Sequence, residues 1–448
     1  MNLTDLQNEK VAVCVSGGLD SKTIARKFVD LDIEVLCFTA DLAQADEEDI
    51  KGVADKMAPC GVDTIAVDLK TAMGEACFEV IQAQAQYDGG YWNSTGIARA
   101  VTVKGLIPVM QAHGCTVLAH GATGRGNDQM RFERYTNVLA PEMKVYAPWR
   151  DAALLTEFPG RKEMADYLTQ AGIEAFPGGQ KRYSTDANLA GLSYEAEDLE
   201  SLTTPCSIVE PQMGVWPADA PDTPEQFVVR VEKGNAVEIN GAAVSPLAAM
   251  VIANRIGGRN GIGMKNALEN RIIGTKSRGV YESPGMELLA SCLRFVYQAT
   301  MDRRATALFA SLSRLVADQV YDGRYFDPST TASLAAIKTL AQWATGTVTV
   351  DLYKGHVLFH SLTDCPHSIY NEEDSSMEAS QGLNPVSSQG FAEIQSVEAH
   401  ALAHAGGRQL PKALLRADAE TDARPADLGE VDDEVGGLVD RPSLDAPR

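Results

Sequence analysis

The fold is decided by the stretch VAVCVSGGLDS, which runs from Val11 to Ser21. Its apolar half predicts a buried strand, and its two glycines allow the backbone to turn tightly and to approach a ligand closely. Ile24, Phe28 and Leu31 then recur on one face of an amphipathic helix. A strand, a glycine turn and a helix N-terminus together form an anion site, because free backbone N–H groups and the positive end of the helix favour phosphate.

The loop from Ser16 to Ser21 does not have the GxxxxGK[ST] spacing of a Walker A loop. Its SGGxDS form resembles the pyrophosphate loop of ATP pyrophosphatases, which cleave ATP between the α- and β-phosphates. An ordinary glycine-rich turn between a strand and a helix is the alternative interpretation.

Composition limits the class of protein. The chain has 448 residues, enough for two or three domains. The formal net charge is −22, from 61 acidic and 39 basic residues. This balance argues against nucleic acid as a partner, because such binding depends on Lys and Arg at the phosphates. It leaves room for a local basic pocket that holds ATP.

The eight cysteines include no CxxC pair, and several lie in apolar runs. They predict buried free thiols in a reducing compartment rather than a disulfide framework or a zinc site. We find no N-terminal signal sequence and no run of about 18 apolar residues. The sequence therefore predicts a soluble, cytoplasmic protein without a membrane partner.

The first part of the chain alternates between the patterns of strands and helices. Strands are expected at 11–15, 35–39, 63–68 and 116–119, and helices at 21–31, 46–57, 71–85 and 95–112. This alternation predicts a doubly wound parallel sheet. Since ligands bind at the carboxyl ends of such strands, we expect Ser16, Ala40 and Gly121 to gather on one rim.

The pattern changes from about residue 186. Strands are expected at 225–232 and 347–352, and helices at 286–319, 330–344 and 391–405. The last thirty or so residues are rich in acid and proline and are expected to be disordered. We therefore expect an α/β protein with a nucleotide-binding domain over 1–185, a second α+β domain over 186–388, and a C-terminal helix and acidic tail over 389–448.

A second polar segment, residues 120–133, directly follows the expected strand at 116–119. It places Thr123, Asn127, Asp128 and Arg131 within nine positions. This mixture suits a zwitterionic amino acid, because arginine binds a carboxylate with two hydrogen bonds and aspartate binds an ammonium group. A polar loop with a helix cap is the alternative.

Two further segments complete the pattern, YSTDANL at 183–189 with SYE at 193–195, and ENRIIGTKSRGVYESPG at 269–285. With SGGLDS and GATGRGNDQMRFE, they resemble argininosuccinate synthase from about Val11 to Gly285, and more weakly beyond. That family joins citrulline to aspartate and converts ATP to AMP and pyrophosphate. Its second domain is a synthetase and oligomerisation domain.

The resemblance implies a reaction through a citrullyl-adenylate. The ureido oxygen attacks the α-phosphorus, the SGGLDS loop holds the departing pyrophosphate, and Mg²⁺ neutralises phosphate charge. The amine of aspartate then displaces AMP. Catalysis of this kind depends mainly on positioning and charge stabilisation.

The resemblance also assigns site residues. ATP would contact Cys14, Val15, Ser16, Gly17, Gly18, Leu19, Asp20, Ser21, Lys22, Ala40, Gly121, Thr123, Asp128 and Asp186. Citrulline would contact Tyr91, Asn127, Arg131, Ser184, Ser193, Glu195, Glu269 and Tyr281. Aspartate would contact Thr95, Thr123, Asn127 and Asp128, and the catalytic residues would be Ser16, Asp20, Asp128 and Arg131.

Three positions depart from the family pattern. Lys22 stands in place of a serine, and its side chain either reaches the phosphates or points into solvent. Ala43 stands in place of a glycine, so we expect an ordinary backbone angle there. Gly96 stands where some members have a serine that contacts citrulline. These departures leave open a related ligase that uses another ureido or carbamoyl acceptor.

Outside these segments, His400 and His404 are interpreted as a helix face rather than a zinc site, since a catalytic zinc usually has three protein ligands. No metal ligands are therefore assigned. In the family a C-terminal helix crosses between subunits, so the expected helix at 391–405 implies a homotetramer. The sequence also leaves open tRNA thiolation or GMP synthesis within the wider pyrophosphatase class, and a paralogue that only binds nucleotide.

Overall fold

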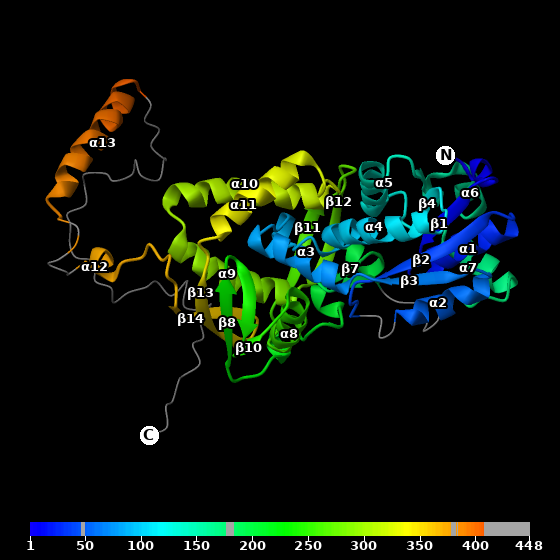
Figure 1. Ribbon diagram of the computed structural model, residues 1–448, viewed down its shortest axis with the longest axis horizontal. Helices are drawn as coiled ribbons and strands as arrows, with labels where there is room; N and C mark the ends of the chain where they lie inside the picture. Colours follow the sequence, from blue (N-terminus) through cyan, green and yellow to red (C-terminus); the bar gives the residue numbers. More distant parts are fainter. Residues whose placement is uncertain (46–49, 176–182, 378–381, 383, 407–448) are drawn as a thin grey trace, which may run out of the picture. The chain divides into compact units, whose positions relative to one another are not determined.

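The computed structural model describes residues 1–45, 50–175, 183–377, 382 and 384–406. Residues Met1–Tyr370 form one compact unit, and the residues from Asn371 onward form another. Figure 1 shows the ribbon with its elements labelled.

The N-terminal part of the compact unit is built on a five-stranded parallel sheet with the order β3-β2-β1-β4-β5. The strands are β1 (Lys10–Cys14), β2 (Glu34–Asp41), β3 (Thr64–Asp68), β4 (Val117–His120) and β5 (Lys144–Tyr146). The order of the strands reverses direction between β1 and β4, and the crevice at such a reversal is the expected place for a ligand.

Helices cover both faces of this sheet. One face is covered by α1 (Leu19–Asp30), α2 (Lys51–Met57), α6 (Ala152–Glu157) and α7 (Arg161–Gln170). The other is covered by α3 (Lys70–Gln82), α4 (Ser94–Ala112) and α5 (Asp128–Leu139). On β1, Val11 and Val13 pack under the helices of the first face, and Ala12 packs under those of the second face. Successive side chains of a strand point to opposite faces of the sheet, which explains this alternation. The predicted doubly wound sheet is confirmed.

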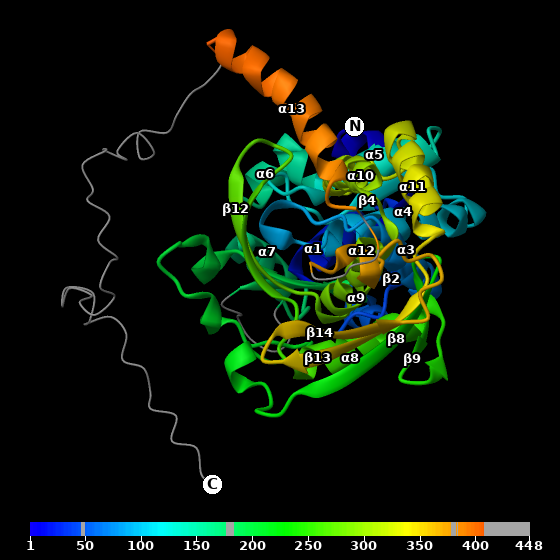
Figure 2. The ribbon, with the colours of Figure 1, turned by 90° about the vertical axis from the view of Figure 1, so that its left-hand side faces the viewer.

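Two antiparallel sheets follow, with the orders β11-β12-β7-β6 and β10-β9-β8-β13-β14. The first has β6 (Ser184–Asn188), β7 (Gly191–Glu195), β11 (Met264–Asn270) and β12 (Lys276–Glu282). The second has β8 (Glu225–Glu232), β9 (Asn235–Ile239), β10 (Ala242–Ala243), β13 (Gly346–Tyr353) and β14 (His356–Thr363). Helix α9 (Pro284–Thr300) packs against β13 and β14, as Figure 2 also shows.

The other helices of this part are α8 (Pro246–Arg259), α10 (Arg303–Tyr321) and α11 (Pro328–Ala341). Short 3-10 helices lie at Leu3–Leu6, Ala58–Cys60, Asp88–Gly90, Pro148–Arg150, Glu197–Glu200, Cys206–Ile208 and Pro217–Asp219. The prediction of a single helix over 286–319 is wrong, because this range contains parts of two separate helices, α9 and α10. Asp302 caps α10 by accepting hydrogen bonds from the N–H groups of Arg304 and Ala305, and this cap interrupts a continuous apolar period.

The unit from Asn371 onward contains α12 (Glu372–Ser375) and α13 (Ser387–His404), which lies where a helix was predicted over 391–405. Phe391, Ile394 and Val397 on α13 are 67%, 69% and 70% exposed. The tail that we expected to be disordered falls outside the described residues. No helix in the described part of the chain is long and apolar enough to cross a membrane.

The turn after β2 differs from the prediction for Ala43. Ala43 has a φ of +56°, in the left-handed region, where an ordinary angle was expected. Three hydrogen bonds hold the turn: Leu42 N–H to Gln44 Oε1 (2.8 Å), Ala43 N–H to Asp41 Oδ1 (3.1 Å) and Gln44 Nε2 to Ala40 O (2.8 Å). These bonds offset the steric cost of a left-handed alanine, which is about 1 kcal/mol.

We expect Ala43→Gly to raise the free energy of unfolding by about 0.5–1 kcal/mol, because glycine adopts a positive φ without the steric cost of a Cβ atom. Urea denaturation measures the change. Ala310→Gly, in the exposed interior of α10, is the matched control and should lower the free energy of unfolding by about 1 kcal/mol. A loss of stability at position 43 equal to that of the control would contradict the account of this turn.

Candidate active site

The stretch that decides the fold forms a loop at the carboxyl end of β1. Gly17 has a φ of +75°, which glycine adopts without steric cost. The N–H of Ser16 donates to Ser21 Oγ (3.2 Å), so the hydroxyl closes the loop onto itself. The N–H of Lys22 donates to Gly18 O (3.0 Å) as α1 begins. The first N–H groups of α1 therefore stand directly behind the loop, an arrangement that favours an anion.

The carboxyl end of β4 lies against this loop. Cys14 on β1 is in register with Phe38 on β2 and with His120 on β4, so the three strands end at the same level. A Cβ atom on Gly121 would lie 3.5 Å from Asp20 Cβ. The structure thus brings the SGGLDS loop beside the 120–133 segment, as the rule for parallel strands predicts.

Lys22 is buried beside the loop. Lys22 is only 3% exposed, and its Nζ donates a hydrogen bond to Glu174 O at 2.8 Å. The alternative in which Lys22 points into solvent is therefore wrong. Burial lowers the pKa of Lys22, and the nearby charge of Lys56 lowers it further.

Two more basic side chains border the loop. The stem of Lys56 lies over Gly17, where a Cβ atom would come within 3.0 Å of Lys56 Cδ. Burial raises the pKa of Asp20, and the charge of Arg161 opposes this shift. Lys22 and Lys56 therefore lie at the loop, and Arg161 is near enough to act on Asp20, although the chain as a whole carries a charge of −22.

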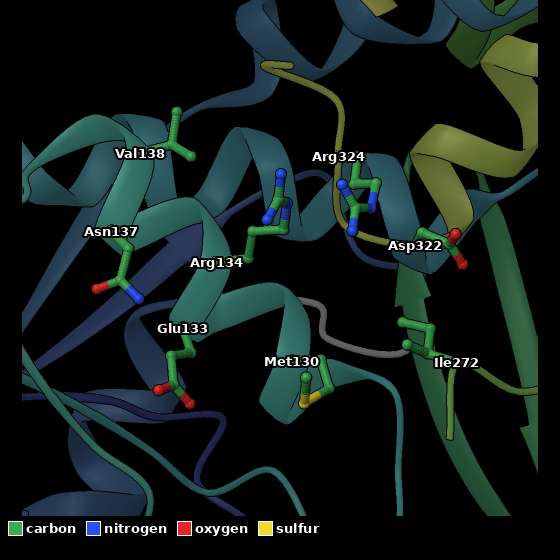
Figure 3. A pocket seen from close by; sticks show the side chains of 8 residues that line it. All are labelled: Met130, Glu133, Arg134, Asn137, Val138, Ile272, Asp322 and Arg324. Atoms are coloured by element: carbon green, nitrogen blue, oxygen red, sulfur yellow. The ribbon is translucent and has the colours of Figure 1, made fainter. Parts of the chain in front are cut away.

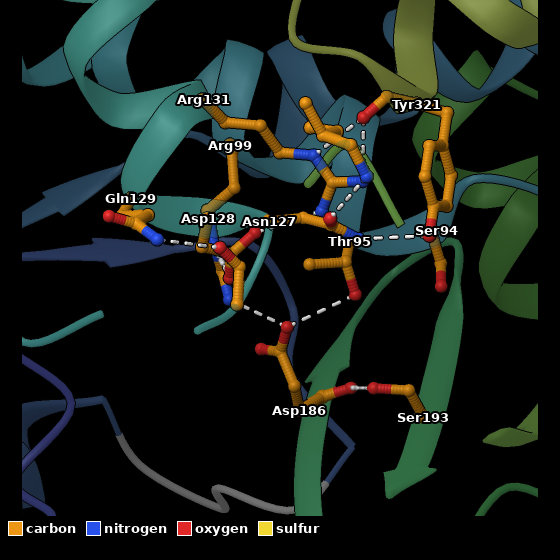
Figure 4. A network of polar contacts seen from close by, with 12 residues as sticks. Ser94, Thr95, Arg99, Asn127, Asp128, Gln129, Arg131, Asp186, Ser193 and Tyr321 are labelled. Atoms are coloured by element: carbon orange, nitrogen blue, oxygen red, sulfur yellow. Dashed lines mark hydrogen bonds and ion pairs between the residues drawn. The ribbon is translucent and has the colours of Figure 1, made fainter. Parts of the chain in front are cut away.

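A network of ion pairs and hydrogen bonds joins the 120–133 segment to β6 (Figure 4). Arg99 donates from Nε to Asp128 Oδ2 (2.9 Å) and from Nη2 to Asp186 Oδ2 (2.6 Å). Thr95 Oγ1 donates to the same Asp186 oxygen (3.1 Å), and Arg131 Nη1 donates to Asp128 Oδ1 (2.9 Å). Asp128 and Arg131, which the sequence analysis assigned to opposite charges of an amino acid, thus bind each other.

Arg99 is a site residue that the sequence analysis did not select. Burial disfavours the charge on Asp128, but Arg99 and Arg131 outweigh this effect and lower the pKa of Asp128. Asp128 is therefore ionised throughout the neutral range. The spacing of Thr95 and Arg99, four residues apart on α4, puts both on one helix face and could have revealed this role.

The sheet β11-β12-β7-β6 carries most of the residues assigned to citrulline. Asp186 pairs with Ser193, and Ser193 pairs with Tyr281 on β12. Ser184 pairs with Glu195 two residues further along the same two strands. Because directly paired residues and residues two apart face the same side of a sheet, these five residues share one face.

Aromatic rings cover part of this face. Tyr281 donates a hydrogen bond to the Glu269 carboxylate. Tyr91 stacks on Tyr281 with 4.2 Å between ring centroids, and its hydroxyl accepts from the N–H of Thr95 (2.9 Å). Tyr91, Glu269 and Tyr281 are each no more than 3% exposed, so this corner of the site is fixed by packing.

Glu195 has a shifted pKa within the same face. Burial and then the charge of Glu269 raise the pKa of Glu195 to about 7, while Arg271, whose Nη2 is 3.8 Å from Glu195 Oε2, opposes the shift. Near neutral pH the Glu195 carboxyl therefore exchanges between an acid that donates a hydrogen bond and a carboxylate that only accepts.

The structure therefore gathers the assigned residues in two groups. The first group lies at the carboxyl edge of the parallel sheet and consists of Cys14 to Lys22, Ala40, Gly121 and Thr123. Within it, burial raises the pKa of the Cys14 thiol to about 12. The citrulline group lies on the antiparallel face, and Asp128 and Asp186 connect the two groups through Arg99. Ser16, Gly18 and Thr123 are the exposed members of the first group, and Ser184 is the exposed member of the second.

Among the described residues, no three His, Cys, Asp or Glu side chains are arranged to hold a metal ion. Mg²⁺ usually keeps several waters and needs only one or two carboxylates besides the phosphates of a substrate. Asp20, at the start of α1, fits this limited role. Asp128 and Asp186 fit it less well, since both already bind Arg99.

A cavity of about 570 Å³ lies on the other side of α5 (Figure 3). It is lined by Met130, Glu133, Arg134, Asn137, Val138, Ile272, Asp322 and Arg324. None of the residues that the sequence analysis assigned to a substrate lines it. Its arginines are engaged within the protein, because Arg134 and Arg324 both pair with Asp327.

Comparison with known proteins identifies the class. A model described as the arginosuccinate synthase N-terminal HUP domain matches residues 10–174, and one described as the arginosuccinate synthase C-terminal domain matches residues 183–402. The parallel sheet with its glycine loop is thus a HUP domain, and it is followed by the C-terminal domain of the same family.

Curated relatives give the same result. A protein of Rhodopirellula baltica named argininosuccinate synthase is 40% identical over 385 residues, which cover 85% of this chain and 95% of the relative. The chloroplastic argininosuccinate synthase of Arabidopsis thaliana is 36% identical over 391 residues, 86% of this chain and 78% of the relative. The chain belongs to the argininosuccinate synthase family, whose members are ATP-dependent ligases of arginine biosynthesis.

We expect Glu195→Gln to raise the free energy of unfolding at pH 8 relative to the unchanged protein, and the difference to shrink toward pH 5. A carboxyl whose pKa rises from 4.5 to about 7 on folding contributes stability that is present at low pH and is lost as the pH rises through 7. Because the side chain is 39% exposed, solvent screening limits the effect to about 1 kcal/mol.

Urea denaturation at several pH values between 5 and 8 measures this difference. Glu200→Gln, at an exposed glutamate outside the site, is the control. A stability difference that grows toward pH 5 instead would contradict the assignment of the shifted pKa to Glu195.

Proposed function

We propose that this chain condenses citrulline with aspartate through a citrullyl-adenylate, and releases argininosuccinate, AMP and pyrophosphate. Membership of the family supports this reaction. The observation that carries it is the bridge from Asp128 through Arg99 to Asp186, which joins the phosphate-binding edge to the tyrosine-lined face. An enzyme that activates one substrate with ATP and then transfers it to another needs two such regions with a common boundary.

In the first step the ureido oxygen of citrulline attacks the α-phosphorus, and the bond between the α-phosphorus and the bridging oxygen of pyrophosphate breaks. The N–H groups of the loop and the N-terminus of α1 hold the departing pyrophosphate. Lys22 and Lys56 add positive charge at this edge. Bound Mg²⁺ supplies neutralisation of the phosphate charge, and Asp20 would be its protein ligand.

In the second step the amine of aspartate attacks the ureido carbon, and the bond from that carbon to the oxygen of AMP breaks. Asp128 and Thr95 lie at the boundary of the two regions, where the aspartate must approach. Tyr91, Glu195, Glu269 and Tyr281 would hold citrulline on the other side, with the remaining residues in the roles that the family assigns. Catalysis then consists of positioning and charge stabilisation.

The family also suggests how the protein is assembled. We propose a cytoplasmic homotetramer in which α13 packs on another subunit. The spacing of Phe391, Ile394 and Val397 supports this, because these exposed side chains recur every three residues along the helix. The division into parts at 1–185, 186–388 and 389–448 belongs to the same proposal.

We expect AMP, pyrophosphate and argininosuccinate to form from Mg-ATP only when citrulline and aspartate are both present. Mass spectrometry detects the product, and reactions that omit each amino acid are the controls. AMP release that needs another ureido or carbamoyl compound in place of citrulline would favour a related ligase. ATP binding without any AMP release would contradict an enzymatic function.

We expect Lys22→Ser to raise the KM for ATP by about fivefold or more, because it removes a buried cation beside the phosphate loop. Lys10→Ser is the control, since Lys10 lies at the opposite end of β1 and pairs with Glu34. If Lys22 only fixes the carbonyl of Glu174, the variant will lose stability while its KM for ATP stays unchanged, and a role for Lys22 in ATP binding would be wrong.

A further inference from the structure

We infer that Tyr321, the last residue of α10, is a positioning residue that orients the citrulline-binding side chains and so sets the affinity for the acceptor. The inference rests on the proposed function, because citrulline is the acceptor that it concerns. Neither the sequence pattern nor the resemblance selected Tyr321. It comes from the second half of the chain and interacts with Arg131 of α5 and Glu269 of β11.

Tyr321 holds two residues of the 120–133 segment. Its carbonyl oxygen accepts from Nε and Nη2 of Arg131 (2.9 and 2.8 Å), and its hydroxyl accepts from Asn127 Nδ2 (2.9 Å). Its ring also faces the guanidinium, with Arg131 Cζ 5.1 Å from the ring centroid. Asn127 is fixed at its other end by the N–H of Ile272, which donates to Oδ1 (3.0 Å). Tyr321 thus determines the orientation of both side chains.

The hydroxyl of Tyr321 extends this network to Glu269. Burial raises the pKa of Tyr321 well above its ordinary value, and the charge of Glu269 and a hydrogen bond to its carboxylate raise it further. Tyr281 donates to the same carboxylate, so both tyrosines interact with Glu269, while Asn127 donates to the hydroxyl of Tyr321. Tyr321 is buried, and its hydrogen bonds are made with side chains assigned to citrulline, so we assign it to position those side chains.

Packing fixes the ring itself. Tyr87 stacks on Tyr321 with 3.8 Å between centroids, and Tyr91 meets its edge at 6.4 Å. The end of α10 also approaches α4 closely, because a Cβ atom on Gly96 would lie 2.8 Å from Val320 O. A side chain at position 96 would therefore clash with the backbone of Val320, the residue before Tyr321.

The test compares the KM for citrulline with the KM for ATP in Tyr321→Phe. Loss of the buried hydroxyl and its hydrogen bonds should raise the KM for citrulline about fivefold, while the KM for ATP stays within about twofold. Tyr321→Leu also removes the ring contacts and should raise the KM for citrulline by roughly tenfold or more.

Tyr297→Phe is the matched control, because it removes a buried hydroxyl of α9 that donates to Gln82 O (2.9 Å), away from the site. It should leave both KM values unchanged. Equal changes in the two KM values, no change in the KM for citrulline, or the same effect in Tyr297→Phe would each overturn the role of Tyr321. Thermal denaturation confirms that each variant is folded.

Calorimetry separates this inference from the proposed function. Citrulline is titrated into each protein with Mg²⁺ and α,β-methylene-ATP present, and the same fold-changes in affinity are expected. If the unchanged protein forms no argininosuccinate but binds citrulline, the proposed function fails while the calorimetric ratios still decide the role of Tyr321. A protein that does not bind citrulline at all would overturn both.

Discussion

The rest of the site depends on the guanidinium of Arg99. It binds Asp128 on α5 and Asp186 on β6, and these two carboxylates belong to the HUP domain and to the antiparallel face. Removing one member of such a buried or partly buried ion pair leaves an uncompensated charge, which costs about 3 kcal/mol. Since Thr95 on the same helix also binds Asp186, α4 contributes two side chains to the boundary across which an activated substrate must pass.

Local charge, rather than net charge, decides what the loop can bind. The chain carries −22 overall, yet Lys22, Lys56 and Arg161 lie beside the glycine loop. Exposed charges farther away than about 10 Å are largely screened by salt, whereas a buried ammonium acts through a low dielectric. The acidic surface therefore does not prevent the binding of a triphosphate, although it argues against long anionic polymers.

The sequence predicted the parallel sheet and its loop because apolar runs and glycine pairs are local signals. It failed where neighbours override such signals: Asp302 splits one apolar period into two helices, and three hydrogen bonds hold Ala43 at a positive φ. The role of Arg99 could have been predicted from its spacing from Thr95, which places both residues on one face of α4. Tyr321 was not, because it lies 190 positions from the arginine that it holds, and only the tertiary structure brings them together.

The antiparallel face to which we assign the acceptor combines two carboxyl groups with tyrosine hydroxyls. Glu195 and Glu269 share this face, and their repulsion together with burial raises the pKa of Glu195 to about 7. The Glu269 side chain accepts a hydrogen bond from the hydroxyl of Tyr281 and also interacts with Tyr321. The face therefore offers hydrogen bonds more than charge, which suits a ureido amino acid that is neutral overall. Discrimination among acceptors then depends on how accurately these hydrogen-bond donors are oriented. An unpaired buried polar group costs more binding free energy than a lost apolar contact.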